Sequence, residues 1–262
     1  MSKLIPVLLA AAVSITAYSA VSIVRNNSAE NKVVETATVE NMLEGKSIAF
    51  IGDSISYGAN WYGGYGKIIG EQNNMIVTNP SIGGATFARN ITWSADSEGL
   101  RPSIIDMTDK LTDKYDYIIV EGGVNDFWNH VELGALTEGF DGGYDELTMT
   151  GAIESTFFRL RENHPESKTG FVIIHNPFTY NAEGDFAPYY EMLKAVCDKW
   201  EVPYIDLYAA NNAETGVNVK DAEMNKIYFG SESSPEGDGC HPNEEGYRKI
   251  YVEPMVPWLK TM

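Results

Sequence analysis

The sequence predicts an α/β protein in which helices cover both faces of a parallel sheet. Short apolar runs with the length of buried strands alternate along the chain with longer amphipathic stretches typical of helices. The apolar runs are continuous, as expected for strands that are buried on both faces. The chain has 262 residues, 44% of them hydrophobic, which suits one domain of this class once the N-terminal segment is set aside.

Five apolar runs are expected to form the strands, and amphipathic stretches between them the helices. The strands are predicted over 48–51, 75–78, 117–120, 171–174 and 204–207. The helices are predicted over 65–72, 103–114, 148–163, 189–200 and from 243 through 251. A long loop over 127–146 and a polar stretch over 210–237 separate some of them.

Right-handed crossovers place the carboxyl ends of parallel strands at one edge of the sheet. Open α/β sheets bind their ligands at that edge. The residues that follow the predicted strands are therefore expected to meet there. They include Ser54, Gly84, Asn125 and His175.

The N-terminal segment differs in composition from the rest of the chain. No charge occurs from Leu4 to Val24, a run long enough to span a bilayer as a helix. A basic start, an apolar middle and Ala17-Tyr18-Ser19 also suit a signal peptide with its cleavage site. Either interpretation places the protein outside the cytoplasm, secreted or held at the membrane. The expected division is a signal peptide or membrane anchor (1–25), a linker (26–44) and one domain (45–262).

The formal net charge of −18 excludes two classes of partner. Nucleic acid binding needs clustered Lys and Arg, and so does docking on an anionic membrane surface. The two cysteines, Cys197 and Cys240, are too few for a framework of disulfides. An extracellular location would permit them to pair, but their spacing leaves this open. The oligomeric state is equally open.

Ser54 is the candidate nucleophile, because it stands in a Gly-Asp-Ser turn directly after the first predicted strand. A nucleophilic serine needs a base, and His241 is the best candidate among the four histidines. Asp238 precedes His241 by three residues, a spacing that lets its carboxylate orient the imidazole. Taken alone, each motif has a simpler interpretation: a polar turn for Gly-Asp-Ser, and a polar loop or half of a metal site for Asp-x-x-His.

Acyl transfer also needs donors for the developing oxyanion. Gly84 can supply a backbone N–H in a close turn, and Asn125 its side-chain amide. A flexible loop and a helix cap, respectively, are the alternatives for these two segments. When the four segments are considered together, these simpler interpretations become less convincing than they are for any single segment.

Taken in order, the four segments resemble the SGNH (GDSL-type) hydrolase family over essentially the whole globular part of the chain. The resemblance implies a flavodoxin-like three-layer α/β/α sandwich with five parallel strands in the order 2-1-3-4-5. It also implies catalysis without a metal or other cofactor. The matching blocks are Gly52-Asp53-Ser54, Asn79-Pro-Ser-Ile-Gly-Gly84, Gly123-Val-Asn-Asp126 and Asp238-Gly-Cys-His241.

The resemblance assigns a role to each matching residue. Ser54 would be the nucleophile, His241 the base and Asp238 the acid that orients it. The oxyanion hole would be formed by the N–H groups of Ser54 and Gly84 and the side chain of Asn125. Further candidates for substrate contact are Asp53, Asp126, Trp128 and His175.

The expected function is that of an extracytoplasmic serine esterase acting on a small-molecule or glycan acyl ester. Removal of O-acetyl groups from a carbohydrate is the preferred substrate class, because loop aromatics could stack on sugar rings. A role as loop anchors is equally open for these aromatics. They are Trp61, Tyr62, Trp93, Phe127 and Trp128.

Three alternatives remain open at this point. The same site suits a lipase, a thioesterase or an O-acyltransferase. A glycan-binding module without catalysis is a second alternative. A metal-dependent hydrolase would use Asp53, His175, Asp238 and His241, but it would leave Ser54 without a role.

Overall fold

The computed structural model describes residues 41–94, 98–210 and 215–262. Residues Met42–Met262 form one compact unit. The predicted signal peptide or anchor, and nearly all of the predicted linker, lie outside the described residues. Within the described ranges, no helix is both long enough and apolar enough to cross a membrane.

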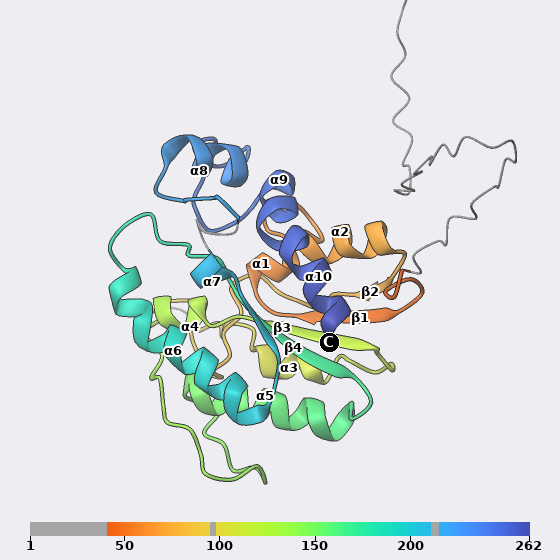
Figure 1. Cartoon of the computed structure of the whole chain (residues 1–262). Coiled ribbons are helices and arrows are strands. Elements are labelled where there is room, and N and C mark those ends of the chain that lie inside the picture. Colours follow the sequence, from red (N-terminus) through yellow and green to blue (C-terminus); the bar gives the residue numbers. More distant parts are fainter. Residues whose placement is uncertain (1–40, 95–97, 211–214) are drawn as a thin grey trace, which may run out of the picture. The chain divides into compact units, whose positions relative to one another are not determined.

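The core of the unit is a five-stranded sheet whose strands all run parallel (Figure 1). The strand order is β2-β1-β3-β4-β5, which confirms the predicted 2-1-3-4-5 arrangement. Each strand coincides with one of the five predicted apolar runs to within a few residues. Their bounds are β1 Ser47–Ile51, β2 Ile76–Thr78, β3 Tyr117–Glu121, β4 Lys168–Ile173 and β5 Tyr204–Asp206.

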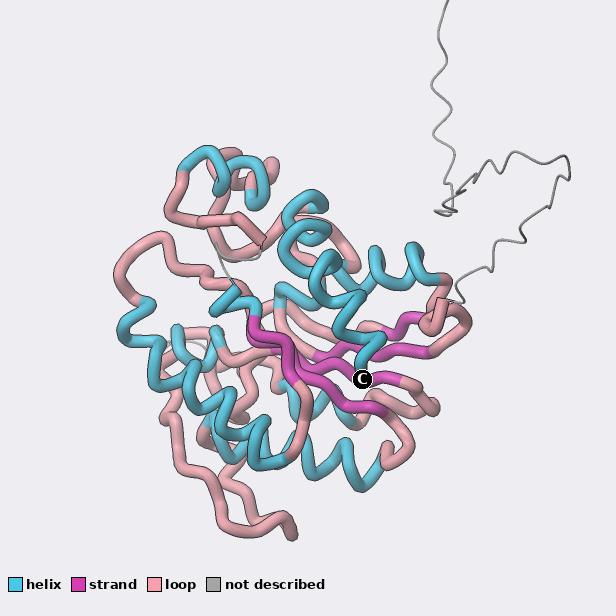
Figure 2. The backbone as a smooth tube through the Cα atoms, in the orientation of Figure 1, coloured by secondary structure: helices cyan, strands magenta, loops and turns pink. Residues whose placement is uncertain are grey.

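Helices lie on both sides of this sheet, so the unit has three layers (Figure 2). One face packs against α2 (Gly64–Asn73), the π-helix η1 (Tyr247–Val252) and α10 (Glu253–Thr261). The other face packs against α3 (Ile104–Thr108), α5 (Met149–Asn163) and α6 (Glu183–Trp200).

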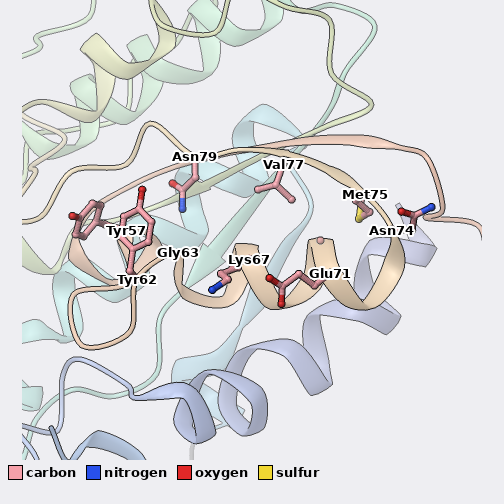
Figure 3. A pocket seen from close by; sticks show the side chains of 10 residues that line it. Tyr57, Tyr62, Gly63, Lys67, Glu71, Asn74, Met75, Val77 and Asn79 are labelled. Carbon is pink, nitrogen blue, oxygen red and sulfur yellow. The ribbon is translucent and has the colours of Figure 1, made fainter. Parts of the chain in front are cut away.

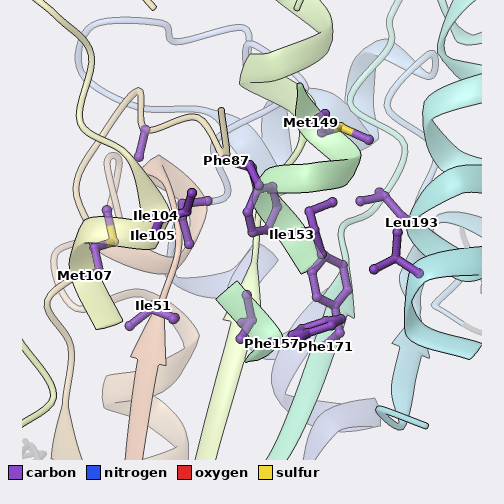
Figure 4. Packing of buried hydrophobic residues seen from close by; sticks show 14 of the residues in the cluster. Ile51, Phe87, Ile104, Ile105, Met107, Met149, Ile153, Phe157, Phe171 and Leu193 are labelled. Carbon is purple, nitrogen blue, oxygen red and sulfur yellow. The ribbon is translucent and has the colours of Figure 1, made fainter. Parts of the chain in front are cut away.

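Strand β1 shows why the sheet is covered on both faces. Successive side chains of a strand point to opposite faces. Ile48 and Phe50 pack on the face covered by α2, η1 and α10, whereas Ala49 and Ile51 pack on the face covered by α3, α5 and α6. Figure 4 shows the core on the face covered by α3, α5 and α6, in which the ring of Phe171 of β4 packs against the rings of Phe157 of α5 and Phe87.

The shorter helices depart most from the sequence prediction. Two of them, α1 (Ser54–Tyr57) and α4 (Val124–Trp128), begin just after β1 and β3, so the long loop starts after Trp128. Helix α8 (Ala222–Phe229) lies inside the predicted polar stretch and is capped by Asp221, which accepts the N–H of Met224. The two remaining short helices are α7 (Leu207–Ala210) and α9 (Glu244–Gly246).

The two cysteines are free thiols. Cys197 is a residue of α6 and packs in the core on that side of the sheet, whereas Cys240 packs in the core on the opposite side. Both are buried, which raises the pKa of each thiol above its ordinary value. They therefore act as small apolar side chains in this structure.

Candidate active site

Strand β1 delivers Ser54 to the carboxyl edge of the sheet. Gly52 ends the strand where a side chain would not fit, because a Cβ there would lie 2.7 Å from the carboxylate of Glu121. Asp53 then caps α1 by accepting the N–H of Ile55 at 2.9 Å. Ser54 is the first residue of this one-turn helix and is partly exposed.

Ser54, His241 and Asp238 form a continuous hydrogen-bonded chain. The Oγ of Ser54 lies 2.9 Å from Nε2 of His241, and Nδ1 of His241 lies 2.7 Å from Oδ2 of Asp238. The other oxygen of Asp238 accepts the N–H groups of Cys240 at 2.9 Å and of His241 at 2.8 Å. The loop that carries the base is thus folded around the carboxylate that orients it.

The electrostatics of this chain suit a base that is held next to an ionised carboxylate. Burial lowers the pKa of His241, but the hydrogen bond and charge of Asp238 and the charge of Asp53 outweigh it and raise this pKa above its ordinary value. Burial raises the pKa of Asp238, but its bonds to His241 and Cys240 outweigh it and lower this pKa. Asp238 therefore stays ionised and stabilises a protonated His241.

The glycine turn after β2 lies directly beside the nucleophile. A Cβ on Gly83 would be 3.8 Å from Cβ of Ser54. Gly84 follows with a φ of +75°, a conformation that favours glycine. In the described part of the chain, the N–H groups of Ser54 and Gly84 make no hydrogen bond with protein. Both donors are therefore free to meet an oxyanion.

Asn125 reaches the same turn from α4. Its Nδ2 donates to Oδ2 of Asp53 at 2.9 Å and to the carbonyl of Ala85 at 3.0 Å. The amide is thus placed beside Gly84, but both of its N–H groups are occupied by protein acceptors. To donate to an oxyanion, it would have to exchange one of these two bonds.

A second buried carboxylate, which the sequence analysis missed, supports the turn around Ser54. Glu121 ends β3, and its Oε2 accepts the N–H of Asp53 at 3.3 Å, the N–H of Ser56 at 3.2 Å and the hydroxyl of Ser56 at 2.8 Å. Burial, followed by the charge of Asp53, raises the pKa of Glu121 well above its ordinary value. The available signal was an acidic residue ending an otherwise apolar strand.

His175 does not line the site as a substrate contact, which corrects the sequence prediction. It is completely buried, with Nδ1 2.7 Å from the hydroxyl of Tyr251 and Nε2 3.1 Å from the carbonyl of Gly239. A carbonyl only accepts, so Nε2 carries the proton and Nδ1 accepts from Tyr251. Burial lowers the pKa of His175 to about 4. His175 therefore positions the loop between Asp238 and His241.

Asp53 and Asp126 are also buried rather than presented to a substrate. The two oxygens of Asp126 accept the N–H groups of Phe87 and Ala88, each at 2.9 Å. Asp126 thus holds the segment that follows Gly84, and Asp53 holds Asn125. Both act through the residues that they position, which corrects their assignment as substrate contacts.

Three of the five predicted loop aromatics lie in α4 or at the glycine turn. Phe127 is an anchor, since its ring packs edge-to-face with Phe178 and Phe186 at centroid distances of 5.5 and 5.3 Å. Trp93 and Trp128 are 47% and 37% exposed and remain available for a ligand. A Cβ on Gly84 would be 2.6 Å from the Trp93 ring, which therefore lies directly over the glycine turn.

Arg101 is a further residue at this turn that the sequence analysis did not single out. Its Nη1 donates to the carbonyl of Gly84 at 3.0 Å, and its guanidinium lies 4.5 Å from the centroid of the Trp93 ring. Burial lowers its pKa from the ordinary value. Arg101 and Trp93 thus form one wall beside the glycine turn.

The side chains proposed for a metal site are used in other ways. Among the described residues, no group of three or more His, Cys, Asp and Glu side chains is arranged to hold a metal ion. Both nitrogens of His175 and Nδ1 of His241 already have partners. The geometry instead brings together a hydroxyl, an imidazole and a carboxylate, which is the arrangement for nucleophilic attack by serine.

Comparison with known proteins agrees with this geometry. The family model described as the GDSL-like Lipase/Acylhydrolase family matches residues 50–249. One solved structure is 26% identical, covers 84% of this chain and 98% of that chain, and has a TM-score of 0.65. No curated protein is similar enough to count as a match.

Two further solved structures share the fold at lower identity. A structure from Bacteroides ovatus, described as a GDSL-like lipase, is 20% identical, with coverage of 84% of this chain and 100% of that chain and a TM-score of 0.58. An active-site mutant of a family two carbohydrate esterase from Clostridium thermocellum is 15% identical, with coverage of 82% and 63% and a TM-score of 0.52.

Proposed function

Since this chain belongs to the GDSL-like lipase/acylhydrolase family and is therefore a hydrolase of ester bonds, we propose that it removes O-acetyl groups from a carbohydrate, with Ser54 as the nucleophile. The observation that carries the assignment of the nucleophile is the hydrogen-bonded chain from Ser54 through His241 to Asp238. No other described serine has a histidine with an orienting carboxylate at its hydroxyl.

The reaction follows from this geometry in two halves. In the first, Nε2 of His241 accepts the proton of Ser54 as Oγ attacks the ester carbonyl carbon, and the carbonyl oxygen becomes an oxyanion. The N–H groups of Ser54 and Gly84 stabilise that charge, together with Asn125 once it releases one of its present bonds. The C–O bond to the sugar then breaks, and His241 returns the proton to the departing sugar oxygen.

The second half releases the acyl group. His241 accepts a proton from water as the water oxygen attacks the acyl-enzyme carbonyl carbon. The bond to Oγ of Ser54 breaks, His241 returns the proton to Oγ, and acetate leaves. Asp238 remains ionised throughout and stabilises the imidazolium in both halves.

Two observations support a carbohydrate as the substrate class. The carbohydrate esterase from Clostridium thermocellum shares the fold of this chain. Two exposed indole rings also lie in this region, that of Trp93 at the glycine turn and that of Trp128 at the end of α4. Such rings suit the apolar faces of sugars.

The proposal includes a location outside the cytoplasm, supported by the uncharged segment from Leu4 to Val24. The segment would either be cleaved or hold the enzyme at the membrane. Fractionation of cells that express the full chain, followed by mass spectrometry of its N-terminus, tests this. Recovery of the intact chain from the cytoplasm would contradict the location.

Hydrolysis of a matched set of esters tests the function itself. The set contains p-nitrophenyl esters of acetate, butyrate and octanoate and partially O-acetylated oligosaccharides, assayed with wild-type protein and Ser54→Ala. We expect acetate release from the oligosaccharides and a preference for the acetyl ester, both lost in Ser54→Ala. Wild-type activity that survives in Ser54→Ala would overturn the nucleophile. A preference for octanoate, with no release from oligosaccharides, would indicate a lipase or thioesterase instead.

A further inference from the structure

A groove lies between α2 and the edge strand β2, and Tyr57 of α1 is part of its lining (Figure 3). Its volume is about 440 Å³. Tyr57 and Asn79 stand at one end, and Asn74 and Met75 at the other (Figure 3). Tyr57 closes the helix that Ser54 opens, so the two are separated by roughly 5 Å along the helix axis. One end of the groove therefore lies at the C-terminal end of the helix that begins with Ser54.

The loop between α1 and α2 connects the groove to the catalytic histidine. Asn60 in this loop donates to the carbonyl of His241 at 2.6 Å. Tyr62, two residues later, lines the groove. At the other rim, the amide of Asn79 donates to the carbonyl of Ser56 at 2.8 Å. A ligand in the groove is thus held by segments that are themselves bonded to the residues around Ser54.

The lining of the groove suits a carbohydrate better than an acyl chain. Of the ten lining residues, four carry charged or amide side chains (Lys67, Glu71, Asn74 and Asn79), two are tyrosines, and only Met75 and Val77 are aliphatic. Tyr57 and Tyr62 are 40% and 75% exposed, and their rings meet edge-to-face at 5.7 Å. Exposed aromatic faces stack on the C–H faces of sugars, and the polar groups around them can bond hydroxyls, whereas an acyl chain needs a continuous apolar wall.

Two charged side chains of the groove are also available to a ligand. Lys67 and Glu71 lie one turn apart on α2, yet within the described ranges neither makes an ion pair. The ammonium of Lys67 lies 4.6 Å from the centroid of the Trp61 ring. An ammonium and a carboxylate on one wall provide donors and acceptors for the hydroxyls of a sugar.

We propose that this groove binds the carbohydrate chain that carries the acyl group, with the sugar units next to the acylated one. The inference rests on the proposed function, because it extends the same substrate beyond Ser54. A short substrate would contact only the site, whereas a longer one would also contact Tyr62 and Glu71. The effect of the groove must therefore grow with the length of the oligosaccharide.

Steady-state kinetics on substrates of increasing length tests the groove. The substrates are p-nitrophenyl acetate and partially O-acetylated xylo-oligosaccharides and manno-oligosaccharides of two to six units. In Tyr62→Ala we expect KM for the longest oligosaccharides to rise about tenfold, with a smaller rise for shorter ones and the smallest for p-nitrophenyl acetate. Tyr62→Phe keeps the ring and should restore most of the binding. Glu71→Gln should raise KM in the same length-dependent way, and Glu223→Gln, an exposed acid on α8, is the matched control.

Three results would overturn the groove as a carbohydrate subsite. One is wild-type KM in Tyr62→Ala at every length, and another is an equal loss on p-nitrophenyl acetate. The third is a loss confined to p-nitrophenyl octanoate, assayed beside these substrates, which would make the groove an acyl site.

Direct binding separates this inference from the proposed function. If wild-type protein releases no acetate from any oligosaccharide, the proposed substrate is wrong. Calorimetry then measures binding of unacetylated oligosaccharides to Ser54→Ala. Binding that is retained in Ser54→Ala/Glu223→Gln and lost in Ser54→Ala/Tyr62→Ala supports the groove. Absence of binding to Ser54→Ala refutes it.

Discussion

The buried carboxylate of Asp53 holds the amide of Asn125, with Oδ2 2.9 Å from Nδ2. Its other oxygen accepts the N–H of Ile55, in the first turn of the helix that carries Ser54. One side chain thus joins the turn of the nucleophile to a donor 72 residues away in the chain. We infer that Asp53 is a positioning residue that acts through Asn125.

Asp53→Ala should lower kcat for p-nitrophenyl acetate with little change in KM. The substitution removes the carboxylate that holds the amide of Asn125 in its orientation. Loss of one oxyanion donor typically lowers kcat by about 10²–10³, which is the loss expected for Asn125→Ala and the upper limit for Asp53→Ala. If Asp53 acts through Asn125, the double variant should be no slower than Asn125→Ala alone. Additive losses in the double variant would show that Asp53 acts independently, and thermal unfolding controls for misfolding.

The pH dependence of kcat/KM should reveal the raised pKa of His241. Only neutral His241 can accept the proton of Ser54, so activity is lost as the pH falls through its pKa. Burial lowers that pKa, but Asp238 and Asp53 outweigh it, so the acid limb should lie above the ordinary histidine value of 6.5. The measurement is the rate with a non-ionisable acetyl ester over a range of pH. An acid limb below the ordinary value would contradict this account.

Asp238→Asn should lower kcat by about 10⁴ and move the acid limb to lower pH. The substitution removes the charge that raises the pKa of His241 and disturbs the tautomer that presents Nε2 to Ser54. Asp221→Asn, which changes the cap of α8, serves as the control and should keep the wild-type profile. If the pH profile of Asp238→Asn kept the acid limb of the wild type, a group other than Asp238 would determine the pKa of His241.

The sequence was sufficient where the signal is local. Each strand is a continuous apolar run. Ser54, Asp238 and His241 lie in short motifs, and these motifs were enough to predict the nucleophile, the acid and the base. It was insufficient where the partner is remote. The hydroxyl of Tyr251 forms a hydrogen bond with Nδ1 of His175, and no residue near His175 in the sequence indicates this partner. Glu121 was overlooked because its partners at Asp53 and Ser56 are reached only when β1 and β3 pair.

His175→Gln should change how stability depends on pH. Burial lowers the folded-state pKa to about 4, below the ordinary 6.5. Above the ordinary value both states are neutral, so the titration contributes nothing. As pH falls from the ordinary value toward the folded one, the unfolded chain gains a proton that the folded chain excludes. Wild-type protein then loses up to about 3 kcal/mol of stability.

Urea unfolding of both proteins across this pH range measures the effect. The variant lacks the titration, so the difference in unfolding free energy between wild type and His175→Gln should shrink as the pH falls. A difference that stays constant would mean that His175 is not buried as a neutral imidazole. We also expect a lower kcat in the variant, since His175 supports the carbonyl of Gly239 between Asp238 and His241.

Glu121→Gln should be tolerated, whereas Glu121→Leu should not. Burial and the charge of Asp53 raise the pKa of Glu121 well above its ordinary value, which favours the neutral acid more than in an exposed glutamate. The side-chain oxygen of Gln can accept the hydrogen bonds from the N–H groups of Asp53 and Ser56. Its NH₂ group would take the place of Oε1, which has no hydrogen-bond partner among the described residues. Leucine leaves these buried donors without an acceptor, at a cost of about 1–3 kcal/mol for each.

The pH dependence distinguishes a neutral Glu121 from a charged one. A raised pKa stabilises the folded state below the unfolded value of 4.5, and that contribution is lost as the pH rises. The stability of Glu121→Gln relative to wild type should therefore increase from acidic to neutral pH in chemical unfolding. If Glu121→Gln is instead as unstable as Glu121→Leu at neutral pH, the carboxylate is ionised in the folded protein, and its charge is needed behind Ser54.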